Sequence, residues 1–231
     1  MADGARTRSA GETRPYVGGS AATPGHPGRN VMNPYGQEYT NRQVNRSSLR
    51  KFARRLYLRH VQKYVSGATV DFGCGTGEML RRLPAGSVGL EINAISVAYC
   101  RTRGLPAYLY DPEKDDYALS MLIPGVYQTF VMLHVLEHLD RANDVLARIL
   151  SSCNWLGIKR AIIVVPGEKG FAFDRTHRTF IDGKYIIDHN LETIGVYGIS
   201  KMKYFPFNSS RIGRYITHNE LVIIYDAIPK C

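Results

Sequence analysis

Cysteine is scarce in this chain of 231 residues, and the few cysteines are scattered. The four of them form no C-x-x-C pair: Cys74, Cys100, Cys153 and Cys231. Disulfide frameworks and zinc sites both require clustered or closely spaced cysteines, so the sequence favours neither. We therefore expect reduced thiols and predict a protein of the cytoplasm or of another reducing compartment.

Long apolar runs and internal repeats are also missing. No stretch reaches the roughly 20 apolar residues that a membrane-spanning helix needs. The first residues lack the apolar core of a signal peptide. We expect a soluble protein without a transmembrane segment, and its length suits one catalytic domain of ordinary size.

Acidic residues are almost absent from the first part of the chain. Residues 1–66 contain twelve Lys or Arg against three acidic residues, which places +9 of the total charge of +10 in this segment. Residues 1–30 are rich in Gly, Ala, Pro, Ser, Thr and Arg. Such a composition buries too little surface to offset the entropy of ordering the chain. We predict a basic, disordered extension over residues 1–45 and a catalytic domain over residues 46–231.

A basic amphipathic helix is expected at the start of that domain, over residues 46–65. Apolar side chains recur at roughly helical spacing, and lysines or arginines fill most other positions. The apolar residues are Leu49, Phe52, Ala53, Leu56, Leu58, Val61 and Tyr64. One interpretation is a helix packed on the sheet with a solvated cationic face. The other is a surface for an anionic partner such as RNA, a phosphorylated glycan or an acidic membrane.

The most informative stretch is a glycine-rich turn, Val70–Glu78. An apolar run precedes it and helical spacing follows it from Met79, which predicts a strand, a turn and a helix start. Gly73, Gly75 and Gly77 allow the backbone to turn sharply and a ligand to approach without meeting a Cβ atom. The helix N-terminus beyond them offers free N–H groups to a polar or anionic ligand.

A second carboxylate lies twenty residues after Asp71. The run Ser87–Glu91 is typical of a short apolar strand that ends in Glu91. An acidic side chain at this position of a βαβ unit can accept hydrogen bonds from both ribose hydroxyls of a nucleotide. The preceding turn has glycines at alternate positions rather than the G-x-G-x-x-G spacing that cradles a pyrophosphate. The pattern therefore argues against a dinucleotide.

The Asp-x-Gly-x-Gly-x-Gly pattern from Asp71, followed by the Glu91 strand, resembles the class I S-adenosylmethionine (SAM) methyltransferases. A second segment, His134–Leu139, resembles the L-E-H segment of many small-molecule and glycan methyltransferases of this class. The resemblance implies SAM as the cofactor. It implies nine cofactor-binding residues, namely Asp71, Gly73, Cys74, Gly75, Gly77, Glu91, Ile92, Asp111 and His134.

Each of these residues has a role implied by the resemblance. The glycine turn is expected to wrap the amino-acid end of SAM, and Glu91 to hold the ribose. Ile92 and Asp111 are expected beside the adenine, and the His134 strand is expected to end beneath the sulfonium. Asp71 is expected to orient the turn or the SAM ammonium, although it also suits a carboxylate that only binds loop amides.

Strands and helices alternate along the rest of the chain. Strands are expected over Leu105–Tyr110, Tyr127–Leu133 and Arg160–Val165, and helices over Ala94–Arg103 and His138–Cys153. This alternation predicts an α/β fold with a parallel sheet covered on both faces and ligands at the carboxyl ends of its strands. The resemblance implies a Rossmann-like, doubly wound, seven-stranded sheet, mostly parallel, that closes with an antiparallel C-terminal hairpin. The hairpin is expected over Met202–Phe207 and Glu220–Ala227, with Gly195–Gly198 in the connection before it.

Two histidines, His177 and His134, are the candidate catalytic residues. His177 lies in Gly167–Arg178, at the same expected sheet edge as His134. A histidine there can remove a proton from a hydroxyl during methyl transfer, because its pKa lies near the operating pH. Asp174 is placed to orient it, and a structural bond to the backbone is the alternative role. The expected acceptor pocket contains Arg175, His177, Arg178, Phe171, Phe173, Phe180 and Tyr185.

A divalent metal is a further expectation that comes from resemblance. The small-RNA 3′-terminal 2′-O-methyltransferases and the ubiquinone-pathway O-methyltransferase share an E-x-x-E-H segment whose side chains can hold a metal ion. This chain offers His134-x-x-Glu137-His138, and His177 could reach the same edge. His134 replaces the first carboxylate, which favours a softer metal than Mg²⁺. Metal-assisted and metal-independent reactions both stay open at this point.

The expected reaction is methyl transfer to a hydroxyl of a small molecule or glycan. No N-P-P-Y motif follows the fourth strand, which disfavours amino-group methylation of a nucleobase or glutamine. No cysteine lies beside a base at the site, which disfavours 5-methylcytosine chemistry. The alternative is an RNA-associated protein, either a 2′-O-methyltransferase or an RNA-binding assembly factor with a vestigial methyltransferase fold, that binds RNA through the basic N-terminal segment.

Overall fold

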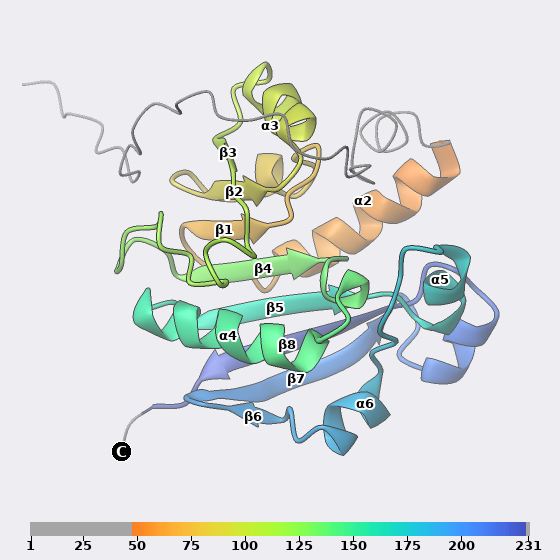
Figure 1. Ribbon diagram of the computed structural model, residues 1–231. Helices are drawn as coiled ribbons and strands as arrows, with labels where there is room; N and C mark the ends of the chain where they lie inside the picture. Colours follow the sequence, from red (N-terminus) through yellow and green to blue (C-terminus); the bar gives the residue numbers. More distant parts are fainter. Residues whose placement is uncertain (1–47, 230–231) are drawn as a thin grey trace, which may run out of the picture.

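The computed structural model describes residues 48–229, so the extension predicted for residues 1–45 lies outside the described residues. The described residues form an eight-stranded sheet in the order β3-β2-β1-β4-β5-β8-β7-β6 (Figure 1). The strands are β1 Thr69–Phe72, β2 Val88–Glu91, β3 Ala107–Leu109, β4 Thr129–Leu133, β5 Arg160–Val165, β6 Thr193–Ile194, β7 Tyr197–Phe205 and β8 Glu220–Ala227. The α-helices are α2 Ser48–Gln62, α3 Ala94–Arg101, α4 Ala142–Trp155, α5 Glu168–Phe173 and α6 Gly183–Asp188.

The sheet is parallel from β3 to β5 and antiparallel beyond. β1 pairs in parallel with β2 and β4, and β5 pairs in parallel with β4. β8 inserts antiparallel between β5 and β7, with Val165 opposite Leu221. The amino end of β8 therefore lies at the same edge as the carboxyl ends of the parallel strands. This α/β arrangement with an antiparallel C-terminal hairpin is as the sequence predicts.

The expectation of seven strands is wrong, because the sheet has eight. The extra strand is the two-residue β6, which pairs with the start of β7 through a tight turn at Gly195. Gly195 has φ +59°, a conformation that glycine adopts at little cost. Tyr197 and Gly198, expected in a connection, are therefore the first residues of β7.

The core has two layers, one on each face of the sheet. Along β5, Ala161, Ile163 and Val165 pack with the apolar face of α4, which crosses the near face of the sheet in Figure 1. The alternate residues Ile162 and Val164 pack with α2 on the other face. Because both faces are covered, β5 is apolar throughout rather than alternating.

Two helix starts differ from the expectation. Only a short 3₁₀ turn, η1 Leu80–Arg82, follows the glycine loop, where a longer helix was expected. Another 3₁₀ turn, η2 Leu136–His138, follows β4, and α4 begins at Ala142 rather than at His138. The residues after β4 are thus an irregular turn, which carries several of the candidate side chains.

The basic helix α2 packs with one face on the sheet. Tyr57, Leu58 and Val61 are buried, whereas Leu56 is exposed. The sequence pattern predicts Leu56 on the apolar face and omits Tyr57. At this turn of the helix, the buried position is therefore one residue later than predicted. Within residues 48–229, no helix is both long and apolar enough to span a bilayer.

His60 of α2 makes the stability of the protein depend on pH. Its buried ring stacks on Phe205 with centroids 4.2 Å apart. Burial, with Lys203, Lys63 and Lys201 nearby, lowers its pKa from 6.5 to about 4. The unfolded chain therefore takes up a proton below pH 6.5 that the folded protein accepts only near pH 4.

We expect the free energy of unfolding to fall by roughly 1 kcal/mol between pH 7 and pH 5 through this group, allowing for solvent screening of the lysines. His60→Phe keeps an aromatic ring against Phe205 and removes the titration. Urea unfolding at pH 7 and pH 5 should show a smaller loss in the variant. Equal losses in the two proteins would contradict this assignment.

Candidate active site

The glycine loop after β1 has the backbone that the sequence predicts. Gly73, Gly75 and Gly77 have φ values of +71°, +53° and +74°. A Cβ atom on Gly73 would also clash with a methyl group of Val135, the residue after His134. The loop backbone therefore packs directly on the turn that follows β4, which only glycine allows.

Glu91 at the end of β2 fastens this loop. One carboxylate oxygen accepts a hydrogen bond from the Gly75 amide at 2.7 Å, and the other accepts one from the Asn93 amide at 2.9 Å. The Ile92 amide also donates to this carboxylate, so at least one of its four lone-pair positions stays open for a ligand. Glu91 is buried in the fold and lines the pocket described below. The carboxylate is thus held in a fixed orientation at the tip of its strand.

Asp71 lies behind the loop rather than in the pocket. Its side chain is 2% exposed and accepts a hydrogen bond from the Leu80 amide, and its Oδ2 has no hydrogen-bond partner. Burial raises the pKa of Asp71 to about 7. The geometry matches the alternative role of a carboxylate that binds loop amides.

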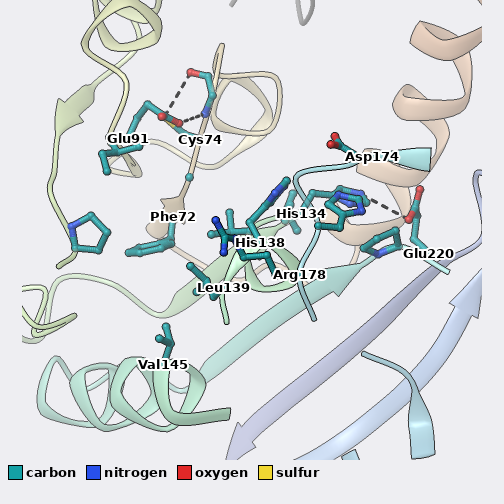
Figure 2. Close-up of a pocket in the computed structure, with 18 of the residues that line it drawn as sticks. Phe72, Cys74, Glu91, His134, His138, Leu139, Val145, Asp174, Arg178 and Glu220 are labelled. Carbon is teal, nitrogen blue, oxygen red and sulfur yellow. Dashed lines mark hydrogen bonds and ion pairs between the residues drawn. The ribbon is translucent and has the colours of Figure 1, made fainter. Parts of the chain in front are cut away.

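A pocket of about 990 Å³ opens along the carboxyl edge of the sheet. Figure 2 shows Glu91 and Cys74 at one end and Glu220 at the other, with His134 and His138 between them. A volume of this size is at the upper end of ordinary ligand sites. It can hold a nucleoside cofactor together with a second molecule.

His134 lies at the centre of this pocket. It follows β4 with φ +57°, an uncommon value for a residue other than glycine. Its Nδ1 lies 3.1 Å from Glu137 Oε1, and its Nε2 lies 3.7 Å from Glu220 Oε2. The ring of Tyr57 packs edge-on against it with centroids 5.6 Å apart. His134 therefore lies between two carboxylates, Glu137 in the turn after β4 and Glu220 at the start of β8.

His177 and His138 complete a cluster around Glu137. The amides of Arg178 and Thr179 donate to the Glu137 carbonyl, which docks the His177 loop on the turn after β4. His177 Nε2 then lies 3.8 Å from Glu137 Oε1, and the His138 and His177 rings are 4.7 Å apart. Ligand atoms of Glu137, His138 and His177 lie within 4.8 Å of one another.

Backbone contacts fix the orientation of the two imidazoles. His177 Nδ1 lies 2.9 Å from the Phe171 carbonyl, and His138 Nδ1 lies 3.3 Å from the Thr176 carbonyl. With Nδ1 donating in each ring, Nε2 carries the free lone pair. The Asp174 carboxylate, expected to orient His177, instead accepts hydrogen bonds from Thr176.

Burial dominates the electrostatics of the cluster. Glu137 is fully buried, its Oε2 has no hydrogen-bond partner, and burial raises its pKa to about 7. Burial also lowers the pKa of His138, which keeps this ring neutral at pH 7. A buried carboxylate beside imidazole nitrogens is a donor set suited to a cation.

Ten of the predicted site residues line the pocket, and eight do not. Those that line it are Gly73, Cys74, Gly75, Glu91, Ile92, His134, His138, His177, Phe173 and Arg178. Asp71, Gly77, Asp111, Glu137, Arg175, Phe171, Phe180 and Tyr185 are not among its lining residues. Asp111 instead pairs with Lys114 at 3.0 Å.

Three further residues line the pocket and were not predicted from the sequence: Arg54, Tyr57 and Glu220. Arg54 forms an ion pair with Glu78 of the glycine turn, so α2 closes over the loop. One signal for Glu220 was available. An antiparallel strand that begins with a carboxylate presents it at the edge where the parallel strands end.

Structural comparisons agree on one architecture. A SAM-dependent methyltransferase from Archaeoglobus fulgidus superposes with a TM-score of 0.58 and 20% identity, over 82% of this chain and 99% of that one. The magnesium protoporphyrin IX methyltransferase of Synechocystis PCC 6803 superposes with a TM-score of 0.57 and 14% identity, over 85% of this chain and 98% of that one. The small RNA methyltransferase HEN1 gives 0.51 and 13%, over 91% of this chain and 28% of that one.

The chain has the fold of the class I SAM-dependent methyltransferases. No family model and no curated protein matches its sequence. At sequence identities of 13–20%, the similarity of these proteins to this chain shows the fold alone. The chemistry has to be argued from its own residues.

Proposed function

We propose that the protein is a SAM-dependent methyltransferase that transfers a methyl group to a hydroxyl of a small molecule or glycan. The observation that carries the proposal is Glu91. It is a buried carboxylate at the end of β2, held by the amides of Gly75 and Asn93, and it faces a large pocket. A methyltransferase fold uses this position to hold a ribose.

The residues on both sides of Glu91 fit the rest of a nucleoside. Ile92 is 47% exposed in the fold and lines the pocket, so an adenine can cover it. Gly73 and Gly75 bring backbone close to the ligand with no Cβ in the way. Bound SAM supplies a methyl group on a positively charged sulfur. The protein then has to align the acceptor, exclude water and take up a proton.

His177 can take up that proton. Its Nδ1 is committed to the Phe171 carbonyl, so Nε2 is the basic nitrogen, and the ring lines the pocket. Nε2 is the atom that would accept the hydroxyl proton in a metal-independent reaction. His134, between Glu137 and Glu220, is placed to position the acceptor hydroxyl at the end of β4.

Glu91→Gln tests the cofactor site. The variant keeps one acceptor oxygen for the loop and loses the negative charge that two hydroxyl donors favour, so we expect affinity for S-adenosylhomocysteine (SAH) to fall about 10- to 100-fold. Isothermal titration calorimetry measures the change, and the melting temperature checks the fold. Glu192→Gln, at an exposed position outside the pocket, is the matched control. Undiminished SAH affinity in Glu91→Gln would refute the cofactor assignment.

A divalent metal at Glu137, His138 and His177 is a second part of the proposal. Two imidazoles and one buried carboxylate suit first-row metals such as Mn²⁺, Fe²⁺, Co²⁺ or Zn²⁺ better than Mg²⁺. The carbonyls that bind both Nδ1 atoms support this, because metal-bound histidines commonly donate the other N–H in this way. A bound metal would act as a Lewis acid toward a substrate oxygen. His134, expected in this set, is not part of the clustered group.

Removing the metal distinguishes the two proposed roles of His177, which are metal ligand and general base. If the metal site is used, EDTA should lower activity at least tenfold, and added Mn²⁺, Co²⁺ or Zn²⁺ should restore it. His138→Ala should lower the content of bound metal measured by mass spectrometry. Full activity in EDTA would end the metal proposal and leave His177 as the base.

An RNA-associated methyltransferase is the second candidate, and a cationic cluster supports it. Arg55 and Arg59 of α2 lie near Arg81 and Arg82, and burial together with these three charges lowers the pKa of Arg82. In the described part of the chain, none of the four has an ion-paired carboxylate. Phosphate groups would relieve their mutual repulsion.

The double variant Arg55→Gln/Arg59→Gln tests this candidate. If RNA binds there, affinity for a single-stranded RNA oligonucleotide should fall with salt, and the variant should reduce the slope of log affinity against log salt by about one or two. Arg175→Gln/Arg211→Gln removes two exposed arginines elsewhere and should leave the slope unchanged. Absence of salt-sensitive binding in the wild type would exclude the RNA candidate.

A further inference from the structure

The end of the pocket opposite Glu91 has two buried polar atoms without a hydrogen bond. Tyr57 and Glu220 are each 6% exposed, and both line the pocket. Among the described residues, neither the Tyr57 hydroxyl nor Glu220 Oε2 has a hydrogen-bond partner, and the nearest basic group to Glu220 Oε2 is His134 Nε2 at 3.7 Å. Leaving such groups unpaired in a folded protein costs free energy, so a ligand that pairs with them is favoured.

The two side chains face the same space. Burial raises the pKa of the Tyr57 hydroxyl, and the strongest charges acting on it are Arg54, which lowers the pKa, and Glu220, which raises it. Both side chains also contact His134, which lies 3.7 Å from Glu220 and edge-on to the Tyr57 ring. Figure 2 shows Glu220 and His134 side by side at this end of the pocket. Tyr57, His134 and Glu220 therefore form one subsite, next to the end of β4.

Glu220 is held rigidly in this place. The preceding residue, Asn219, is fully buried, accepts a hydrogen bond from the Phe207 amide and donates one to the Ser209 carbonyl. The following residue, Leu221, is paired with Val165 of β5. A side chain fixed on both sides needs little ordering when a ligand arrives.

The charge of the pocket determines what this subsite can take. Seven acidic side chains and four arginines line it, and no lysine does. Each of the four arginines already has a carboxylate partner: Arg54 with Glu78, Arg141 with Asp144, Arg148 with Asp116 and Arg178 with Asp140. Among the described residues, carboxylates therefore outnumber arginines in the lining by three, and its other basic groups are histidines, of which His134 and His218 lie 3.7 Å and 3.9 Å from Glu220.

Aromatic rings complete the subsite. Phe205 is paired with Glu220 across β7 and β8 and lines the pocket beside Tyr57. A carboxylate beside aromatic rings can bind an ammonium group through a charge-assisted hydrogen bond, and an open ring face adds cation–π attraction. Neutral hydroxyls could satisfy the same atoms, but they would add no positive charge beside Glu220, whose basic neighbours in the described fold are the imidazoles of His134 and His218.

We propose that Glu220 and Tyr57 bind a protonated amine carried by the methyl acceptor, with the methylated hydroxyl elsewhere on the same molecule. This inference rests on the proposed methyltransferase function and narrows its substrate class to amine-bearing acceptors. Glu220 is then a specificity residue, and β8 supplies it through its antiparallel direction.

Three phenols with different tails test the proposal. Tyramine carries an ammonium, 4-ethylphenol is neutral, and 4-hydroxyphenylpropionate carries a carboxylate, while all three share the ring and hydroxyl. Their binding to protein saturated with SAH is measured by calorimetry. Tyramine should bind at least about tenfold more tightly than 4-hydroxyphenylpropionate, with 4-ethylphenol between them.

Two variants locate this preference. Glu220→Gln should reduce the ratio of tyramine affinity to 4-hydroxyphenylpropionate affinity to about one. Its SAH affinity should stay within about twofold of wild type, which also shows that the variant is folded. Tyr57→Phe removes only the unpaired hydroxyl and should weaken tyramine binding without changing SAH affinity. Glu192→Gln removes the same charge from an exposed position outside the pocket and should preserve the full ratio.

The failures of the two proposals are distinguishable. A wild-type protein that binds no SAH contradicts the methyltransferase function itself. A protein that binds SAH but binds none of the phenols, ranks them equally or prefers the carboxylate overturns the amine subsite. A Glu220→Gln variant that keeps the wild-type ratio overturns it as well.

Discussion

The buried Glu137 is the residue on which the geometry of the pocket depends. Its carbonyl receives the amides of Arg178 and Thr179, and its carboxylate faces His134 and His177. One residue thus fastens the loop after β5 to the turn after β4. Further contacts support this junction, because the Thr179 hydroxyl donates to the Leu139 carbonyl and Arg178 pairs with Asp140. Its buried carboxylate is costly to ionise, which is why imidazoles surround it.

Much of the architecture could be predicted from local patterns. β2, β5 and β8 begin and end where the apolar runs do, because buried strands are continuous apolar segments. The glycine turn and Glu91 were recognisable because their combined spacing resembles that of the class I SAM methyltransferases. The two-residue β6 is too short to show a periodic pattern, so the predicted sheet has one strand fewer than the observed one. The helix expected after the glycine turn is only a 3₁₀ turn.

The acceptor half of the site was harder to predict, because it is assembled from distant segments. His134 and His177 meet through a loop whose docking depends on backbone amides, and such contacts have no sequence pattern. Asp111 was expected in the pocket from a strand-end position, yet it pairs with Lys114 in the fold. Tyr57 was not predicted because the buried face of α2 includes Tyr57 in place of the expected Leu56. Glu220 required knowing that β8 runs antiparallel beside β5.

The contact between Gly73 and Val135 joins the two halves of the molecule. A glycine of the loop after β1 packs against the residue next to His134 so closely that no Cβ fits between them. A shift of the loop would therefore push against the turn that holds His134. Through this one missing side chain, the shape of the Glu91 end of the pocket is tied to the shape of its centre.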